Sequence, residues 1–103
     1  IDIFNKRKDL RHGLDDMRLA LELLLKHLLS NEKSLENQNS DLGVYFKNVG
    51  ISKEISNIFI QIKRLYEIFQ NNNVKHNDNI NPKEVEYIYQ QTLCFMNLLL
   101  KVQ

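Results

Sequence analysis

The sequence predicts an all-α protein, a bundle of four to five helices that forms a single domain over residues 1–103. Two observations favour this fold class. Only three glycines and one proline interrupt the chain and β-branched runs are scarce, a composition that favours helix over sheet. Apolar residues make up 43% of the chain and recur at steps of three and four, the spacing of one face of an α-helix.

The first helix is predicted from a leucine-rich segment that begins near Leu10. Glu22 and Lys26 stand four residues apart in the order that supports a helix. Gly13 lies inside the apolar pattern, so it marks either a close helix crossing or a break between a short leading helix and the main one. The apolar stripe of this segment comprises Leu10, Leu14, Met17, Leu21, Leu24 and Leu28.

The middle of the chain predicts a connection and two further helices. Residues 30–40 are polar and predict a connecting loop with room for motion. Asp41 is the expected N-cap of a short helix that Gly50 ends, and Ser52 is the expected N-cap of the third helix. The stripe of the third helix comprises Ile55, Ile58, Phe59, Ile62, Leu65, Tyr66 and Phe69.

The last helix is predicted to begin at Asn81, as N-cap, with Pro82 at the first helical position. A polar turn therefore separates the last two long helices. Its broad apolar face comprises Val85, Ile88, Tyr89, Thr92, Phe95, Met96 and Leu99. From all the stripes together we expect one buried core that includes Leu10, Leu14, Met17, Leu21, Ile58, Phe59, Ile62, Leu65, Ile88, Phe95 and Leu99.

The first and last helices carry apolar residues on more than one face, more than one small bundle can bury. This surplus predicts a homodimer, or a fused or partner protein domain that covers the remainder. Because the chain begins at Ile1 and not at Met, a fragment of a longer protein is one of the readings left open.

Composition limits the functions that need considering. A net charge of +1 predicts no bulk attraction to nucleic acid, so such binding requires a local patch. The single cysteine, Cys94, lies in an apolar pattern and is expected in the core of a cytoplasmic protein. No segment approaches the roughly 20 consecutive apolar residues of a membrane span, so no membrane is expected as a partner. His12, His27 and His76 lack metal-ligand spacing, and no metal or cofactor motif is present.

The candidate site is the polar stretch that follows Phe69. His76 can exchange a proton near neutral pH, and Lys75 can stabilise a developing anion. Gln70, Asn71 and Asn72 can orient a phosphate or a base edge. This combination suits RNA or nucleotide binding, and metal-independent RNA cleavage with His76 as the catalytic residue. The alternative is structural, with His76 capping a helix end and the amides satisfying exposed backbone groups.

The order of these elements resembles the HEPN superfamily, small α-helical domains of bacterial defence, toxin and abortive-infection systems. A leucine-rich first helix precedes a helix that ends in polar residues, then a His and a closing helix. His76 matches the family's His and Asn71 its polar residue, whereas Gln70 stands where active members carry Arg. The resemblance implies two-fold dimers, and binding of RNA or nucleotide without cleavage.

We therefore expect a HEPN-like dimerising module with a binding or regulatory role in a defence or nucleic-acid-processing system. The replacement of Arg by Gln70 favours a non-enzymatic role. Two alternatives stay open at this point. One is an active endoribonuclease that uses His76, with Lys75 as its cation. The other is a purely structural oligomerisation domain of a larger enzyme.

Overall fold

A computed structural model describes residues 3–69 and 81–103, with side chains from residue 12 onward. Within these ranges every regular element is a helix, which confirms the predicted all-α bundle. The elements are α1 (Ile3–Leu29), a short 3₁₀ helix η1 (Leu35–Asn37), α2 (Asn39–Asn48), α3 (Lys53–Ile68) and α4 (Pro82–Val102).

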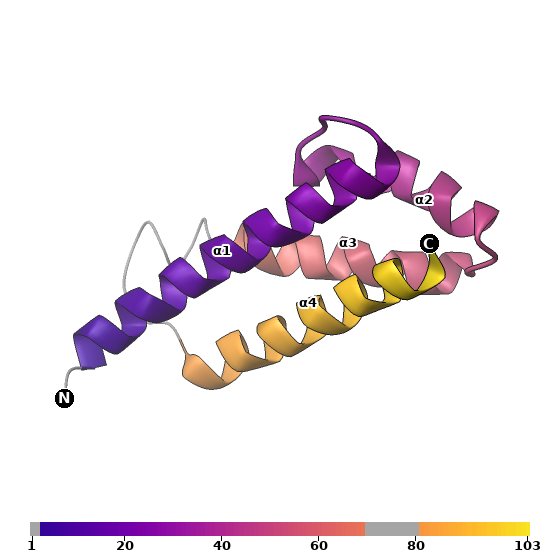
Figure 1. Ribbon diagram of the computed structural model, residues 1–103. Coiled ribbons are helices and arrows are strands. Elements are labelled where there is room, and N and C mark those ends of the chain that lie inside the picture. Colours follow the sequence, from indigo (N-terminus) through magenta and orange to yellow (C-terminus); the bar gives the residue numbers. More distant parts are fainter. Residues whose placement is uncertain (1–2, 70–80) are drawn as a thin grey trace.

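The three long helices lie side by side, and α2 packs at one end of them (Figure 1). Helices α1 and α4 run in the same direction, and α3 runs back between the end of α2 and the opposite end of the bundle. The most extensive helix contact joins α1 to α4, followed by the contact of α2 with α3. The molecule is elongated, with extents of 48 × 21 × 21 Å.

All four α-helices contribute to one core. Phe46, Phe59 and Phe95 form its aromatic centre, where the Phe59 and Phe95 rings stack at 5.7 Å and Phe46 meets Phe95 edge-on at 6.0 Å. The two buried hydroxyls of the core bond to each other, with Tyr66 Oη and Thr92 Oγ1 2.7 Å apart. The apolar core residues are Leu14, Leu21, Leu25, Leu35, Leu42, Phe46, Phe59, Ile62, Tyr66, Phe69, Val85, Ile88, Phe95 and Leu99.

Three residues expected in the core are exposed. Ile55 and Ile58 are 37% and 39% accessible, because the buried stripe of α3 is narrower than its apolar pattern. Each residue turns a helix by about 100°, so Ile58 lies on the flank beside buried Phe59. Cys94 is also exposed, next to buried Phe95 on α4. Met17 and Leu65 are partly buried, and Leu10 lies outside the residues whose side chains are described.

Gly13 marks a close helix crossing and no break. Helix α1 continues through it without interruption. A Cβ atom built on Gly13 would lie 1.8 Å from Tyr89 Oη on α4, so any larger residue displaces that tyrosine. The absence of a side chain at Gly13 therefore leaves room for the Tyr89 hydroxyl between α1 and α4.

The residues that begin or end a helix were predicted correctly at three of four positions. Gly50 has φ +83 and follows α2; the amide of Ile51 donates to Phe46 O and that of Gly50 to Lys47 O, the Schellman pattern. Ser52 Oγ accepts from Ile55 N, and Asn81 Oδ1 accepts from Lys83 N.

The prediction for Asp41 was wrong, because α2 begins two residues earlier, at Asn39. Asp41 Oδ2 instead accepts from Asn31 at 2.8 Å and pairs with Lys33 at 3.0 Å. These two hydrogen bonds hold the pKa of Asp41 below its ordinary value. Asp41 thus ties the start of α2 to the preceding connection.

The connection over residues 30–40 is packed, contrary to the predicted loop with room for motion. Leu35 and Gln38 are buried, with 1% and 0% of their surface accessible. Gln38 Nε2 donates to Asn31 Oδ1 at 2.9 Å and to Lys33 O at 3.0 Å, while Asn31 Nδ2 donates back to Gln38 Oε1 at 2.9 Å. Glu22 on α1 accepts from Leu35 N at 3.0 Å. The paired amides of Asn31 and Gln38 thus hold the connection around η1.

Candidate functional site

The sequence-predicted site residues, Gln70, Asn71, Asn72, Lys75 and His76, lie outside the described residues. The RNA or nucleotide binding predicted for them therefore stays a prediction. A hollow of about 250 Å³ lies between α3 and α4 and is lined by Leu65, Phe69, Lys83, Glu84, Tyr87 and Ile88. The charges of Lys83 and Glu84 in its lining balance, so this hollow has no net charge.

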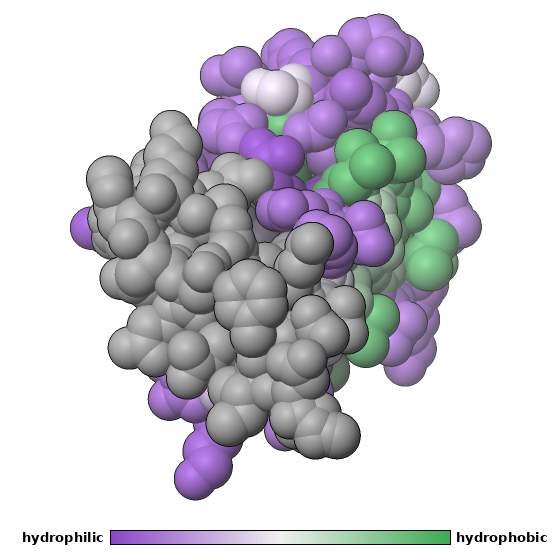
Figure 2. Space-filling model, turned by 90° about the vertical axis from the view of Figure 1, so that its left-hand side faces the viewer, coloured by the Kyte–Doolittle hydropathy of each residue, from purple (hydrophilic) through white to green (hydrophobic). Residues whose placement is uncertain are grey.

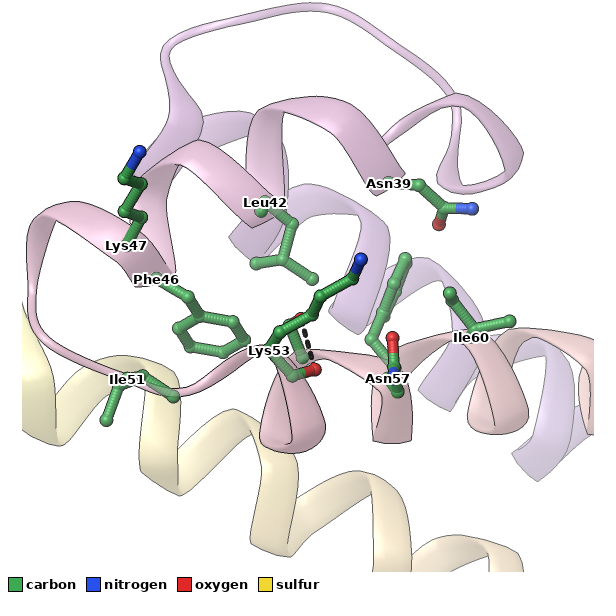
Figure 3. A pocket seen from close by; sticks show the side chains of 11 residues that line it. Asn39, Leu42, Phe46, Lys47, Ile51, Lys53, Asn57 and Ile60 are labelled. Atoms are coloured by element: carbon green, nitrogen blue, oxygen red, sulfur yellow. Dashed lines mark hydrogen bonds between the residues drawn. The ribbon is translucent and has the colours of Figure 1, made fainter.

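A larger hollow lies between α2 and α3 and is called here the α2–α3 groove (Figure 3). Its volume is about 450 Å³, within the range of small-molecule sites. The lining residues are Asn39, Leu42, Gly43, Phe46, Lys47, Ile51, Lys53, Ser56, Asn57, Phe59 and Ile60. Sequence analysis did not identify this site, because its residues belong to two helices and the turn between them.

The floor of the α2–α3 groove is apolar and buried. Leu42 and Phe46 point from α2 toward α3 in Figure 3, and both are buried, as is Phe59 on α3. The groove stays open above them where α2 carries Gly43. A Cβ atom added to Gly43 would meet nothing within 4 Å. The floor is therefore built from core residues whose positions the bundle already holds.

The rim of the groove is polar and positively charged. Lys47 stands on α2, and Lys53 reaches from the first turn of α3 across the opening (Figure 3). Ser56 Oγ donates to Lys53 O at 2.8 Å, and Lys63 Nζ donates to Asn39 Oδ1 at 3.3 Å. Among the described lining residues there is no carboxylate. The groove thus offers an apolar bed with the ammonium group of Lys53 over its opening, whereas the Lys47 side chain borders the groove and points away from it in Figure 3.

A second feature is an apolar surface, called here the α1–α4 face, formed by Leu19, Leu23, Leu93 and Leu100. These side chains are 47–54% accessible. Leu19 and Leu23 are four residues apart on α1, and Leu93 and Leu100 are seven residues apart on α4, so each pair shares one side of its own helix. In Figure 2 apolar residues gather on the right-hand side, the side that faces the reader in Figure 1.

The shifted pKa values belong to structural contacts outside the α2–α3 groove. Burial raises the pKa of Tyr66 to about 12, although its hydrogen bond with Thr92 opposes the shift. Burial and then the charge of Asp16 raise the pKa of Tyr89. Burial alone would raise the pKa of Glu36, but its own backbone amide and the Arg18 guanidinium hold it below the ordinary value.

Within residues 3–69 and 81–103, no three His, Cys, Asp or Glu side chains converge as ligands for a metal ion. No helix in the same ranges combines the length and the apolar character that crossing a membrane requires. Comparison with protein-family models, with curated proteins and with solved structures gave no significant match. The likeness to the HEPN superfamily therefore rests on the pattern of the sequence.

Proposed function

We propose that this chain is a HEPN-like dimerising module of the cytoplasm, with a binding or regulatory role toward RNA or nucleotide in a defence or nucleic-acid-processing system. The observation that carries the dimer is the outer face of α1. Leu19 and Leu23 stand there one helical turn apart, 50% and 54% accessible, although apolar side chains gain by leaving water. A second copy of the chain is the occupant that fits this face.

The charges around these leucines are arranged for a two-fold partner. Asp15 and Asp16 precede Leu19 on the exposed side, whereas His27 follows Leu23 on the same side, beside the partly buried Lys26. Consider two antiparallel copies of α1 related by an axis midway between Leu19 and Leu23. Leu19 of one copy then lies opposite Leu23 of the other. The same axis places Asp15 opposite His27.

The symmetry extends to Asp16, which meets Lys26 of the other copy. A two-fold interface requires such self-complementarity, because each surface must fit its own image. Leu93 and Leu100 extend the same face on α4, which enlarges the apolar area available to the partner. The register is therefore specified by charge, and the affinity comes from leucine burial.

The binding role rests on the sequence motif. Gln70, Asn71, Asn72, Lys75 and His76 provide the donors for a phosphate and a base edge, and a two-fold dimer doubles the number of such stretches. Without the motif Arg, the charge of a phosphorane has only Lys75 to meet it, as a point charge and not a bidentate fork. We therefore rank ribonuclease activity as the second candidate function and a purely structural oligomerisation domain as the third.

Charge reversal tests the dimer and its register. In one variant Asp15 and Asp16 both become Lys, so the face is positive throughout; in the other, Lys26 and His27 both become Glu, so it is negative throughout. Each variant alone should dissociate at least about twofold more readily, since the two symmetry-related Asp16–Lys26 ion pairs, worth ~0.2–1 kcal/mol each, turn repulsive. A mixture of the two should dimerise again.

Light scattering at micromolar concentration is the measurement, with the unaltered chain expected at twice the chain mass. A monomeric unaltered chain, or two variants that fail to associate on mixing, contradicts the proposed interface. Lys101→Glu, on the exposed end of α4, is the matched control and should leave the dimer intact.

The binding role is tested with a short single-stranded RNA. Lys75→Ala should weaken binding and flatten its salt dependence, because one phosphate contact is lost. His76→Ala should abolish any cleavage while the far-UV spectrum stays helical. If the unaltered chain cleaves RNA strongly without metal and His76→Ala abolishes that cleavage, the chain is a ribonuclease. If neither substitution changes RNA binding, the remaining proposal is a purely structural oligomerisation domain.

A further inference from the structure

We propose that the α2–α3 groove is a binding site for a small amphiphilic monocarboxylate, a molecule with an apolar body of the size of a medium-chain fatty acid. The groove is distinct from the sequence-predicted stretch and from the α1–α4 face. Three observations carry the assignment: an open apolar hollow, a glycine that keeps it open, and a rim of one charge.

Gly43 is the first argument, because neither packing nor backbone geometry requires a glycine there. Gly13 leaves room for the Tyr89 hydroxyl, and Gly50 has φ +83, which favours glycine. Gly43 lies within α2 without a positive φ, and space for a side chain is free above it. A glycine inside a helix costs up to ~1 kcal/mol relative to alanine. What it provides in return is the volume of the groove.

The lysines are the second argument. Lys47 lies in the last turn of α2, where the helix dipole favours a cation. Lys53 lies in the first turn of α3, where the dipole disfavours one, so helix stability does not explain it. The Lys53 ammonium lies over the apolar floor in Figure 3, and there is no opposing carboxylate among the described lining residues. An anionic head group on an apolar body is complementary to this arrangement.

The size of the groove selects a small molecule. With about 30 Å³ for each water-sized group, the volume of about 450 Å³ holds on the order of ten to fifteen non-hydrogen atoms. Figure 3 shows the hollow bounded by Ile51 at one end and by Asn39 and Ile60 at the other. The apolar chain lies on Leu42 and Phe46, and its carboxylate lies at the rim under Lys53.

The test is a calorimetric titration with decanoate below its micelle concentration. Saturable binding of one decanoate per chain is expected. Decanol, which has the same chain without the charge, should bind at least about tenfold more weakly. Lys53→Gln should weaken decanoate binding roughly two- to tenfold, and Lys47→Gln should weaken it less. Lys101→Gln removes an exposed lysine elsewhere and should change nothing.

Gly43→Leu tests the hollow itself. It fills the groove from within a helix that tolerates leucine, so decanoate affinity should fall at least about tenfold while the melting temperature holds or rises. Gly43→Ala is the matched control, with the same helix gain but most of the volume left, and should retain binding. The titrations are repeated in the charge-reversed variants of α1, which keeps this site separate from dimerisation.

Three results would overturn the proposal. The first is the absence of saturable decanoate binding by the unaltered chain. The second is equal affinity for decanol, which removes the role of the lysines. The third is unchanged affinity in Gly43→Leu with its fold intact, which places the ligand elsewhere.

Discussion

Replacing Gln38 by Ala tests whether the connection between α1 and α2 is a packed structural unit. Gln38 is fully buried and makes three side-chain hydrogen bonds, two with Asn31 and one with Lys33 O, at 2.9–3.0 Å. At ~0.5–1.5 kcal/mol for each bond, their loss amounts to roughly 2–4 kcal/mol. For a chain of this size the melting temperature should fall by roughly 10–25 °C.

The assay is urea unfolding followed by circular dichroism, with a double-mutant cycle between Asn31 and Gln38. Because two of the three bonds join these two amides, the cycle should report a coupling of ~1–3 kcal/mol. Asn37→Ala is the matched control: its side chain is exposed and bonds to Ser34 Oγ, so the cost should stay below ~0.5 kcal/mol. A Gln38→Ala cost below ~0.5 kcal/mol, or no coupling, would refute the packed connection.

Three further predictions concern the core, a helix cap and alkaline pH. Leu21→Ala should cost ~2–5 kcal/mol in urea unfolding, whereas Ile58→Ala, on the exposed flank of α3, should cost under ~1 kcal/mol; equal costs would contradict the core assignment. Ser52→Ala should cost ~0.5–2 kcal/mol, because the N-cap bond of α3 is lost, and Ser52→Asn should restore most of it. The pKa of Tyr66 is raised from 10.0 to about 12, so its stabilising effect is complete below pH 10 and is lost as pH rises to 12. Unfolding free energy should fall there by ~1.4 kcal/mol per pH unit, roughly 2–3 kcal/mol in all. Tyr66→Phe should flatten this dependence of unfolding free energy on pH, although it also removes the hydrogen bond to Thr92. An unchanged slope in this variant would mean that other groups cause the loss of stability.

Helix boundaries were predictable where neighbouring residues decide them. Ser52 and Asn81 cap helices because their side-chain oxygens reach amides two or three residues ahead. Gly50 ends α2 because the left-handed conformation required there disfavours a side chain. These are interactions within a few residues, so the sequence contains all of their partners. The three–four spacing of apolar residues likewise predicted the buried positions Leu21, Ile62 and Leu99.

Residues 30–40 were misjudged because amide side chains look the same in a mobile loop and in a packed one. The burial of Gln38 depends on Asn31 lying opposite it, and the burial of Leu35 depends on α1, where Glu22 receives its amide. Asp41 was assigned to the cap for a similar reason: its residue type fits a helix start, but Asn31 and Lys33 hold its carboxylate elsewhere.

The candidate sites also divide into those that the sequence predicted and those that only the tertiary structure revealed. The amino-acid sequence by itself determined the helical class, the motif from Gln70 to His76 and the surplus of apolar residues that predicts a partner. Only the tertiary structure decided that Ile58 and Cys94 face outward, and that Gly43, Lys47 and Lys53 border one hollow. The physical reason is that a periodic pattern specifies which face of a helix is apolar, whereas the width of the buried stripe depends on how closely its neighbours pack. A groove between two helices is a property of that packing.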